Sequence, residues 1–467
     1  MIMKRPKPEQ KGAGLHALAV YLLFSGRFYD ADKAAEEAEK FGAAAGSFDA
    51  VKKKYRRMLL NRFAVALLRK FEEAFEKGEY GRVLETGKRL KDEFGESEVV
   101  TAKQAFIEGR MARARLETAG VTRFFRGKVS VTDAGYVAFD YDFDDPLQMA
   151  DFAFDPEVWR AGGGELAVGE DSSYRKGLHH FAVFARHAEM RAEYRNDRPN
   201  SVCFRLGGSW FGVNSFNGTG GIIPSFDEKK LWDAFSVNKT GFAIRMDGFV
   251  HRLRVVASGG GGLLTVDGKK LLEGRTAGRP SSFEMRDLGF ARIRKLHLEG
   301  ELDEKWLGLI GEVTSRMRKG TLAKGLKRTL YSDLYFSRRV KEEVVRGIDA
   351  KFEMGSLPKK IKEPVYSLKY EGLFLVPEAG EYSFHMTMSA RLRLRIDGAA
   401  IADNLQMRDR PDPNTYAKVK LEPGLHRFEL FIANDGEPFL VLRMRYDAGT
   451  GGDFPVPGIL FYHEPEK

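Results

Sequence analysis

The residues whose types and spacing are best suited to bind a ligand lie in a glycine-rich aromatic stretch, "RLGGSWFGVNSFNGTGG" (205–221). Sugar sites commonly combine an aromatic face with amide hydrogen bonds. Trp210, Asn214 and Asn217 could supply both and are candidate ligand-binding residues. Alternatively, Trp210 fills a hydrophobic core and the two asparagines belong to turns.

A second candidate is the polar stretch "ADNLQMRDRPDPNTY" (402–416), in which Asp403, Asn404, Asp412 and Tyr416 could contact a ligand. It follows the alternating run "RLRLRI" and the dipeptide Asp397-Gly398. Asp-Gly is typical of a tight hairpin turn, and the same dipeptide also occurs at 247–248 and 267–268. We therefore interpret Asp397 as a turn residue and not as a ligand.

Catalytic patterns are incomplete. Retaining glycosidases on the concanavalin A fold carry E-x-D-x-x-E on a strand, which places two carboxyl groups about 5 Å apart. In "ELDEKW" (301–306), Trp306 stands where the second glutamate is needed. No convincing serine, histidine and aspartate arrangement is visible, although a scattered one stays open. We predict no catalytic residues.

Metal-ligand patterns are equally weak. His179, His180 and His187 form the densest histidine cluster. On one strand, His179 and His187 would share a face but lie roughly 27 Å apart, so they could not bind one ion. Cys203 is the only cysteine, which rules out an internal disulfide and a CxxC site.

Basic residues dominate the charge, with a formal net charge of +10. This favours acidic partners such as polyanionic glycans, unless the charge serves only solubility. Arg-x-Arg recurs on strand-like runs and would place basic stripes on sheet faces, unless acids on neighbouring strands neutralise them. The repeats are Arg252/Arg254, Arg292/Arg294, Arg391/Arg393/Arg395 and Arg443/Arg445. "RMRKGTLAKGLKR" (316–328) has no acidic residue, and we interpret it as a solvated linker helix. We expect no nucleic-acid partner.

Helical patterns fill residues 14–119. Two similar helix pairs turn at Gly26-Arg27-Phe28 and Gly78-Glu79-Tyr80, 52 residues apart. They resemble tetratricopeptide repeats, although the usual period is about 34 residues and an extra helix must intervene. The resemblance implies a protein partner bound by these helices; a plain helical bundle is the alternative. The apolar piece 15–24 is predicted to be a buried helix.

From residue 121 the period becomes alternating, with a turn signal about every ten residues, as in a β-sandwich. The series "GFAIRMDGFVHRLRVVASGGGGLLTVDGKKLLEG" and the strand "LGFARIRKLHLEG" resemble concanavalin A-like or laminin-G-like jelly rolls. This resemblance covers about 130–300. It also implies an enzymatic alternative, because such domains occur in keto-disaccharide hydrolase-like proteins.

The segment 346–467 contains Gly372, Pro377, "GEYSF" (380–384), "IDG" (396–398) and "LEPGLH" (421–426) in order. It resembles the protective-antigen-type (PA-fourteen) domain, a β-sandwich of bacterial adhesins, toxins and glycosidases. In calcium-dependent lectins of this type, two adjacent aspartates precede the strand that ends in "IDG". Ser389 and Ala390 occupy those places here, so we expect no calcium and no other cofactor.

The predicted fold is therefore multidomain α plus β. A tetratricopeptide-like helical region (1–120) precedes a concanavalin A-like sandwich (121–300), a basic helical linker (301–345) and a protective-antigen-type sandwich (346–467). No stretch reaches the roughly 20 apolar residues of a membrane span. An extracytoplasmic or cell-envelope location is expected if an upstream signal precedes this sequence, and a cytoplasmic one otherwise.

These features predict a non-catalytic binding protein that contacts a glycan, with an acidic glycan as one candidate, in carbohydrate binding or adhesion. Two alternatives remain: a glycan-processing enzyme, and a structural scaffold with no glycan ligand.

Overall fold

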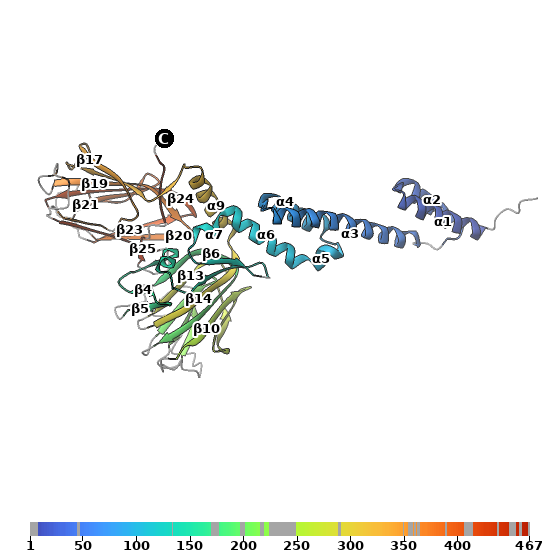
Figure 1. Cartoon of the computed structure of the whole chain (residues 1–467), viewed down its shortest axis with the longest axis horizontal. Helices are drawn as coiled ribbons and strands as arrows, with labels where there is room; N and C mark the ends of the chain where they lie inside the picture. The colour runs from blue at the N-terminus through green and yellow to red at the C-terminus, as the bar shows by residue number, and fades with distance from the viewer. Residues whose placement is uncertain are drawn as a thin grey trace, which may run out of the picture. The chain divides into compact units, whose positions relative to one another are not determined.

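A computed structural model of the chain consists of two compact units, Met1–Ala114 and Arg115–Lys467 (Figure 1). It describes these residues: 8–43, 47–132, 134–169, 177–196, 201–214, 219–223, 249–287, 291–348, 350–353, 358, 361, 365–387, 390–405, 414–436, 439–447, 454–456 and 460–465. The strand "FAIRM", Asn217, Ser389 and Asp412 lie outside these ranges.

Helical hairpins make up the first unit. Its helices are α1 (Pro8–Phe24), α2 (Phe28–Lys40), α3 (Ser47–Glu76), α4 (Tyr80–Phe94), α5 (Glu98–Ala102) and the beginning of α6 (Gln104–Ala119). Gly26 (φ 82°) and Gly78 (φ 69°) form the turns α1–α2 and α3–α4 in a left-handed conformation that favours glycine. Figure 1 shows α4 running alongside the second half of α3.

Two separate hydrophobic cores hold these helices together. One lies among α1, α2 and the start of α3; the other lies among the rest of α3 and α4 to α6. The prediction of a buried helix at 15–24 is only half right. Leu23 is buried, but Tyr21 and Phe24 are 69% and 54% exposed. The short hairpin partner α2, rich in alanine, is too small to cover every apolar face of α1.

The second unit begins with the end of α6 and the short helix α7 (Val121–Phe124) and continues into a 14-stranded antiparallel sheet. Its strands are β1 (Lys128–Val131), β2 (Val137–Tyr141), β3 (Phe152–Phe154), β4 (Trp159–Gly162), β5 (Glu165–Val168), β6 (Leu178–Asn196), β7 (Ser201–Leu206), β8 (Ser209–Asn214), β9 (Thr219–Ile223), β10 (His251–Ser258), β11 (Gly261–Val266), β12 (Lys269–Arg275), β13 (Ser281–Asp287) and β14 (Ala291–Leu302). A 3₁₀ helix, η1 (Pro146–Asp151), precedes β3.

The long strand β6 joins the two layers of this sandwich. Its first part pairs with β3 and β13, and its second part pairs with β10 and β14. One layer therefore runs β1-β2-β14-β6-β10-β11-β12, and the other runs β3-β6-β13-β7-β8-β9. Apolar side chains alternate inward along these strands, as in the burial of β10, so the layers enclose the core.

A second sandwich follows the helix α9 (Glu304–Arg318). Its eight-stranded sheet contains β15 (Ala323–Lys324), β16 (Leu326–Tyr331), β17 (Arg339–Val345), β19 (Val365–Val376), β21 (Arg391–Ile396), β22 (Ala399–Asp403), β24 (Gly424–Asp435) and β27 (Phe461–His463). Its five-stranded sheet contains β18 (Ala350–Glu353), β20 (Gly380–Thr387), β23 (Asn414–Leu421), β25 (Phe439–Asp447) and β26 (Phe454–Pro455). The predicted fold class, a helical region followed by two antiparallel β-sandwiches, is thus confirmed.

The predicted helical linker over 301–345 is wrong for most of its length. Helix α9 begins after its N-cap Asp303, whose side chain accepts a hydrogen bond from the Trp306 amide, and it ends at Arg318. Gly320 and Gly325 have positive φ angles and interrupt the helix. Residues 323–345 then form three strands, because Leu322, Leu326 and Leu330 lie in the core.

The Asp-Gly hairpins at 267–268 and 397–398 are built alike. Asp267 and Asp397 have φ angles of 50° and 51°. Asp267 accepts hydrogen bonds from the His251 ring and from the backbone amide of Arg252. Asp397 accepts the same two bonds from the His426 ring and from the backbone amide of Arg427. Asp397 is therefore held as a turn residue, as predicted.

Candidate functional site

A groove of about 630 Å³ crosses the outer face of the β2-β14-β6-β10-β11 layer. Alternation places small or apolar side chains in the core and polar ones on this face. The groove is lined by Lys128, Asp140, Tyr141, Asp142, Gln148, Arg191, Ala192, Glu193, Arg252, Leu253, Arg254, Thr265, Gly268, Lys295, Leu296 and His297.

Strand register aligns one row of these side chains across the groove. Asp140 of β2 is opposite His297 of β14, which is opposite Arg191 of β6, which is opposite Arg254 of β10. The His297 Nδ1 lies 2.7 Å from Asp140 Oδ1. Neighbouring side chains on one sheet face approach closely enough to interact, so this row forms a continuous charged surface.

In the next row on the same sheet face lies a buried carboxylate, Glu189, which is opposite Glu299 and only 4% exposed. Arg254 donates to it from Nε and Nη2, both at 2.8 Å, and Arg191 donates from Nε. Arg191 also lies 3.7 Å from Glu299, whose Oε2 is 3.1 Å from His297 Nε2. Bidentate guanidinium contacts are directional, so this network fixes the two arginines in place.

The charge state of Glu189 follows from these contacts. Burial alone would raise the pKa of the carboxyl, but the hydrogen bonds from Arg254 and Arg191 outweigh it and hold the pKa below its usual range. Glu189 is therefore an anion at neutral pH. A general acid in glycoside hydrolysis needs the opposite, a raised pKa.

Two cations of the groove are available to a ligand. Within the described ranges, the side chains of Lys128 and Arg252 make no ion pair, whereas Lys295 lies 3.1 Å from Glu193. Glu193 and Asp140 are in turn acceptors that sugar hydroxyl groups could use. The groove thus offers free cationic groups beside fixed acceptors.

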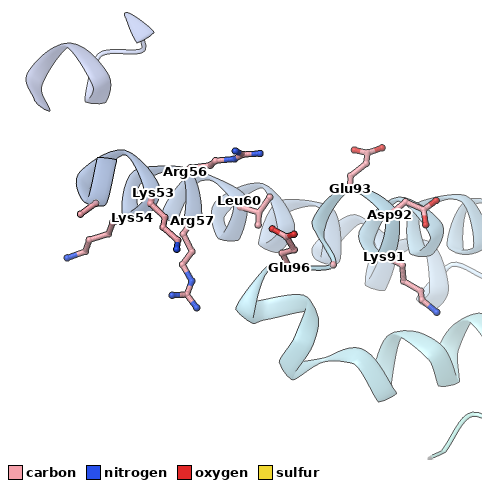
Figure 2. A pocket seen from close by; sticks show the side chains of 11 residues that line it. Lys53, Lys54, Arg56, Arg57, Leu60, Lys91, Asp92, Glu93 and Glu96 are labelled. Atoms are coloured by element: carbon pink, nitrogen blue, oxygen red, sulfur yellow. The ribbon is translucent and has the colours of Figure 1, made fainter. Parts of the chain in front are cut away.

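The helical unit carries a second hollow, of about 1090 Å³, between the first half of α3 and the end of α4. Figure 2 shows the basic lining residues Lys53, Lys54, Arg56 and Arg57 on α3. Asp92, Glu93 and Glu96 also line this hollow. Arg57 pairs with Glu98 at 2.8 Å. In the part of the chain that the structure describes, Lys53, Lys54 and Arg56 have no ion-pair partner.

The residues predicted from the glycine-rich stretch do not line the β-sheet groove. Trp210 is 2% exposed, and the guanidinium of Arg286 lies 4.5 Å from the centre of its ring. Asn214 ends β8, paired with Ser201, and Asn217 lies outside the described residues. The buried position of Trp210 matches the core alternative stated above.

The residues predicted from 402–416 fall at the edge of the C-terminal sandwich. Asp403 ends β22 and accepts a 2.7 Å hydrogen bond from Arg393. Asn404 makes two hydrogen bonds to the backbone of Leu392. Its side-chain Oδ1 accepts from the Leu392 amide at 2.6 Å, and its backbone amide donates to the Leu392 carbonyl. Asn404 therefore has a structural role. Asp412 lies outside the described residues.

Tyr416 of β23 is 71% exposed and stacks on His385 of β20, with ring centroids 4.2 Å apart. Asn414 and Thr387 lie beside this pair, joined by a 3.1 Å hydrogen bond. An exposed ring flanked by amide and hydroxyl groups is a suitable platform for a sugar.

A buried polar cluster joins the two sandwiches. Ser282 Oγ lies near His179 Nε2 at 2.5 Å and donates to Glu378 Oε2 at 3.0 Å, and Arg205 Nη2 lies 2.6 Å from Glu378 Oε1. Burial first, and then nearby Arg205, lower the pKa of His179 to about 3. Ser282 is fully buried, and Glu378 contacts the serine hydroxyl directly. In a catalytic triad the acid instead contacts the histidine, so this cluster does not have the geometry of a triad.

No protein-family model matches the sequence. No curated protein matches it either.

Solved structures give matches of limited extent. An anti-sigma factor domain-containing protein from Clostridium clariflavum is 12% identical over 67% of this chain and 90% of its own, with a TM-score of 0.28. The PA14 domain of the MpAFP antifreeze protein is 15% identical over 31% of this chain and 93% of its own, with a TM-score of 0.26. A PA14 sugar-binding domain from an RTX adhesin is 16% identical over 30% of this chain and 99% of its own, with a TM-score of 0.25. Similarity of this extent assigns neither a family nor a ligand to the chain.

Across the described residues, no group of three or more histidine, cysteine, aspartate or glutamate side chains is placed to hold a metal ion. Among the same residues, no helix combines the length and apolar composition that crossing a membrane requires.

The sequence contained one signal for the β-sheet groove. The Arg-x-Arg pattern identified Arg252 and Arg254, and the expected acids on neighbouring strands are present. Arg254 pairs with Glu189, and Arg292 and Arg294 pair with Glu165. Lys128, Asp140 and His297 carried no recognisable pattern, because they become neighbours only when strands distant in sequence pair.

Proposed function

We propose that this chain is a non-catalytic binding protein whose central sandwich holds an acidic glycan in the groove over β2, β14, β6 and β10. The observation that carries the proposal is the pair of available cations, Lys128 and Arg252, beside a network that fixes Arg191 and Arg254. Cations held in a defined geometry bind a carboxylate or sulfate with little loss of side-chain entropy.

Binding without turnover is supported by the charge of the buried carboxylate. The lowered pKa of Glu189 makes it a poor proton donor at neutral pH. Arg191 and Arg254 occupy its acceptor positions, so it is also a poor nucleophile. The enzymatic alternative is tested directly by measuring the release of reducing sugar from the same glycans.

The deciding experiment is calorimetry with an oligogalacturonate and with a neutral oligosaccharide of matched length. We expect the acidic glycan to bind more tightly, and its affinity to fall as salt concentration rises. The double variant Lys128→Ala/Arg252→Ala should weaken binding about tenfold, as expected for the loss of about 1.4 kcal/mol. Arg339→Ala, which removes an exposed arginine of β17, is the matched control.

Three results would overturn the proposal: equal affinity for both glycans, an unchanged affinity in the double variant, or sugar release that Glu189→Gln abolishes.

We further propose that the helical unit binds an acidic protein segment. The support is the hollow beside α3, where Lys53, Lys54 and Arg56 face open space (Figure 2). Fluorescence anisotropy with a labelled glutamate-rich helical peptide tests this, with a lysine-rich peptide as control. The triple variant Lys53→Glu/Lys54→Glu/Arg56→Glu should abolish binding; unchanged binding would exclude this surface.

The C-terminal sandwich is proposed as a second sugar contact through Tyr416. Its exposed ring on His385, near Asn414, supports this role. Tyr416→Ala should weaken binding of neutral sugars and leave the acidic-glycan groove unaffected. Roles in ligand binding for Trp210, Asn214, Asn217, Asp403, Asn404 and Asp412, and the absence of calcium, remain predictions.

A further inference from the structure

A pocket of about 730 Å³ lies where the central sandwich meets the eight-stranded sheet of the C-terminal sandwich. We call it the junction pocket. One side comes from residues 124–156 of the central sandwich, and the other from the ends of β15 and β17. It is lined by Phe124, Arg126, Leu147, Met149, Ala150, Asp151, Phe152, Phe154, Pro156, Lys324, Gly325, Arg346 and Gly347.

Its rim carries three exposed cationic side chains, Arg126, Lys324 and Arg346. None of the three makes an ion pair with another described residue. Burial, together with the repulsion of Arg126 and Arg346, lowers the pKa of the Lys324 ammonium from its usual value, against the opposing attraction of Asp151. Asp151 offsets only part of the repulsion among these three like charges, so a bound anion would be stabilised at this rim.

Its floor is apolar. Phe124, Met149 and Phe152 are each at most 6% exposed, and Phe154 lies partly buried beside them. Pockets of 300–1,000 Å³ with mostly apolar walls and a few convergent polar groups are typical of small-molecule sites. This floor distinguishes the junction pocket from the β-sheet groove, half of whose lining residues are charged.

One carboxylate limits how much negative charge the pocket accepts. Asp151 lies at the floor, fully buried, where it accepts hydrogen bonds from the Arg126 and Gly127 amides and from Tyr141 Oη. The pocket therefore combines three cations with one buried acid. The charge that remains is positive, which suits a ligand with an acidic group.

We propose that the junction pocket binds a small amphipathic organic anion, with one carboxylate, sulfate or phosphate group at the Arg126, Lys324 and Arg346 rim and an apolar body against the phenylalanine floor. The site is independent of the groove and of the glycan. It needs both sandwiches, because Lys324 and Arg346 belong to one and the apolar floor to the other.

The test uses the full chain and calorimetry with 2-naphthoate, which joins a carboxylate to an apolar body. Its uncharged isostere 2-naphthamide lacks the acid, and acetate lacks the body. We expect 2-naphthoate to bind at least about tenfold more tightly than either. Arg126→Ala and Arg346→Ala should each weaken binding about fivefold. Ala150→Trp, a change at an exposed lining residue, should fill the pocket and abolish binding.

Arg339→Ala is the matched control, because Arg339 is an exposed arginine of the same β17 strand but lies outside the pocket. Carboxylate, sulfonate and phosphonate derivatives of naphthalene then identify the preferred acid. The proposal is overturned if 2-naphthamide binds as tightly as 2-naphthoate, if 2-naphthoate fails to bind, or if the rim variants and Arg339→Ala have equal effects.

Discussion

Glu378, in the turn between β19 and β20, places its Oε1 2.6 Å from Nη2 of Arg205 in the other sandwich. Both side chains are largely buried. Burial alone would raise the pKa of the Glu378 carboxyl, but the charge and hydrogen bonds of Arg205 keep it below its usual range. Glu378 is thus an anion that also accepts hydrogen bonds from Ser282.

We expect Glu378→Ala to destabilise the second unit by about 3–5 kcal/mol, because it leaves the buried Arg205 guanidinium without its partner. Urea unfolding followed by tryptophan fluorescence measures this. Glu381→Ala breaks the exposed pair with Lys418 and should leave the urea midpoint unchanged. Equal midpoints for Glu378→Ala and the wild type would mean that the contact contributes nothing to stability.

Gly372→Ala should displace β27 from β19. A Cβ at this position would lie 2.3 Å from the Tyr462 carbonyl oxygen, and backbone on both strands prevents relief. We expect a loss of about 1–3 kcal/mol in the free energy of unfolding. The control is Gly308→Ala in α9, where a Cβ meets nothing within 4 Å; it should be neutral or slightly stabilising. A fully stable Gly372→Ala would contradict the close β19–β27 packing.

The buried carboxyl of Asp151 should make stability depend on pH. Burial raises its pKa from 3.8 to about 6, against the opposing hydrogen bonds of the Gly127 and Arg126 amides. Because the folded state holds this proton more tightly, the contribution of Asp151 to stability falls as pH rises from 4 to 6. The whole change is on the order of 3 kcal/mol.

Asp151→Asn should remove this dependence. Relative to the wild type, the variant should be less stable at pH 4 than at pH 7, measured as the difference in unfolding free energy. A difference that stays constant between the two pH values would exclude a raised pKa at Asp151.

Asn404→Ala should destabilise the C-terminal sandwich by about 1–3 kcal/mol, because the Leu392 amide loses its side-chain acceptor. Asp403→Ala removes a partly exposed ion pair with Arg393 and should have a smaller effect. Thermal unfolding compares the two variants. If Asn404→Ala instead leaves the unfolding temperature unchanged and reduces sugar binding, Asn404 is a ligand contact.

Local patterns in the sequence were sufficient to predict most strands. Alternation located β6 and β10, and Asp-Gly located the hairpins at 267 and 397. Alternation could not reveal that β6 belongs to both layers, since that depends on which strands pair with each half. The prediction of a helical linker at 301–345 was wrong because the basic residues of this segment were interpreted as a solvated helix. Leu322, Leu326 and Leu330 are buried in the core, and this burial depends on the second sandwich.

The candidate sites were harder to predict for the same reason. Arg252 and Arg254 were recognisable because they alternate within one strand. The junction pocket joins Arg126 to Lys324 and Arg346, which lie about 200 residues apart in the sequence. Trp210 attracted attention as an aromatic residue among glycines, but Gly207 and Gly208 form a turn and the Trp210 ring is buried.

The contact between Glu378 and Arg205 also has a consequence for biosynthesis. The chain emerges from the ribosome N-terminus first, at about 5–20 residues per second. The central sandwich is complete in sequence at Leu302. Roughly 4 to 15 s then pass before Glu378, the partner of Arg205, is synthesised. Lys324 waits longer, because its strand partner β27 begins only at Phe461. During this interval the nascent chain exposes an uncovered sandwich surface, which is the stage at which chaperones would have most to protect.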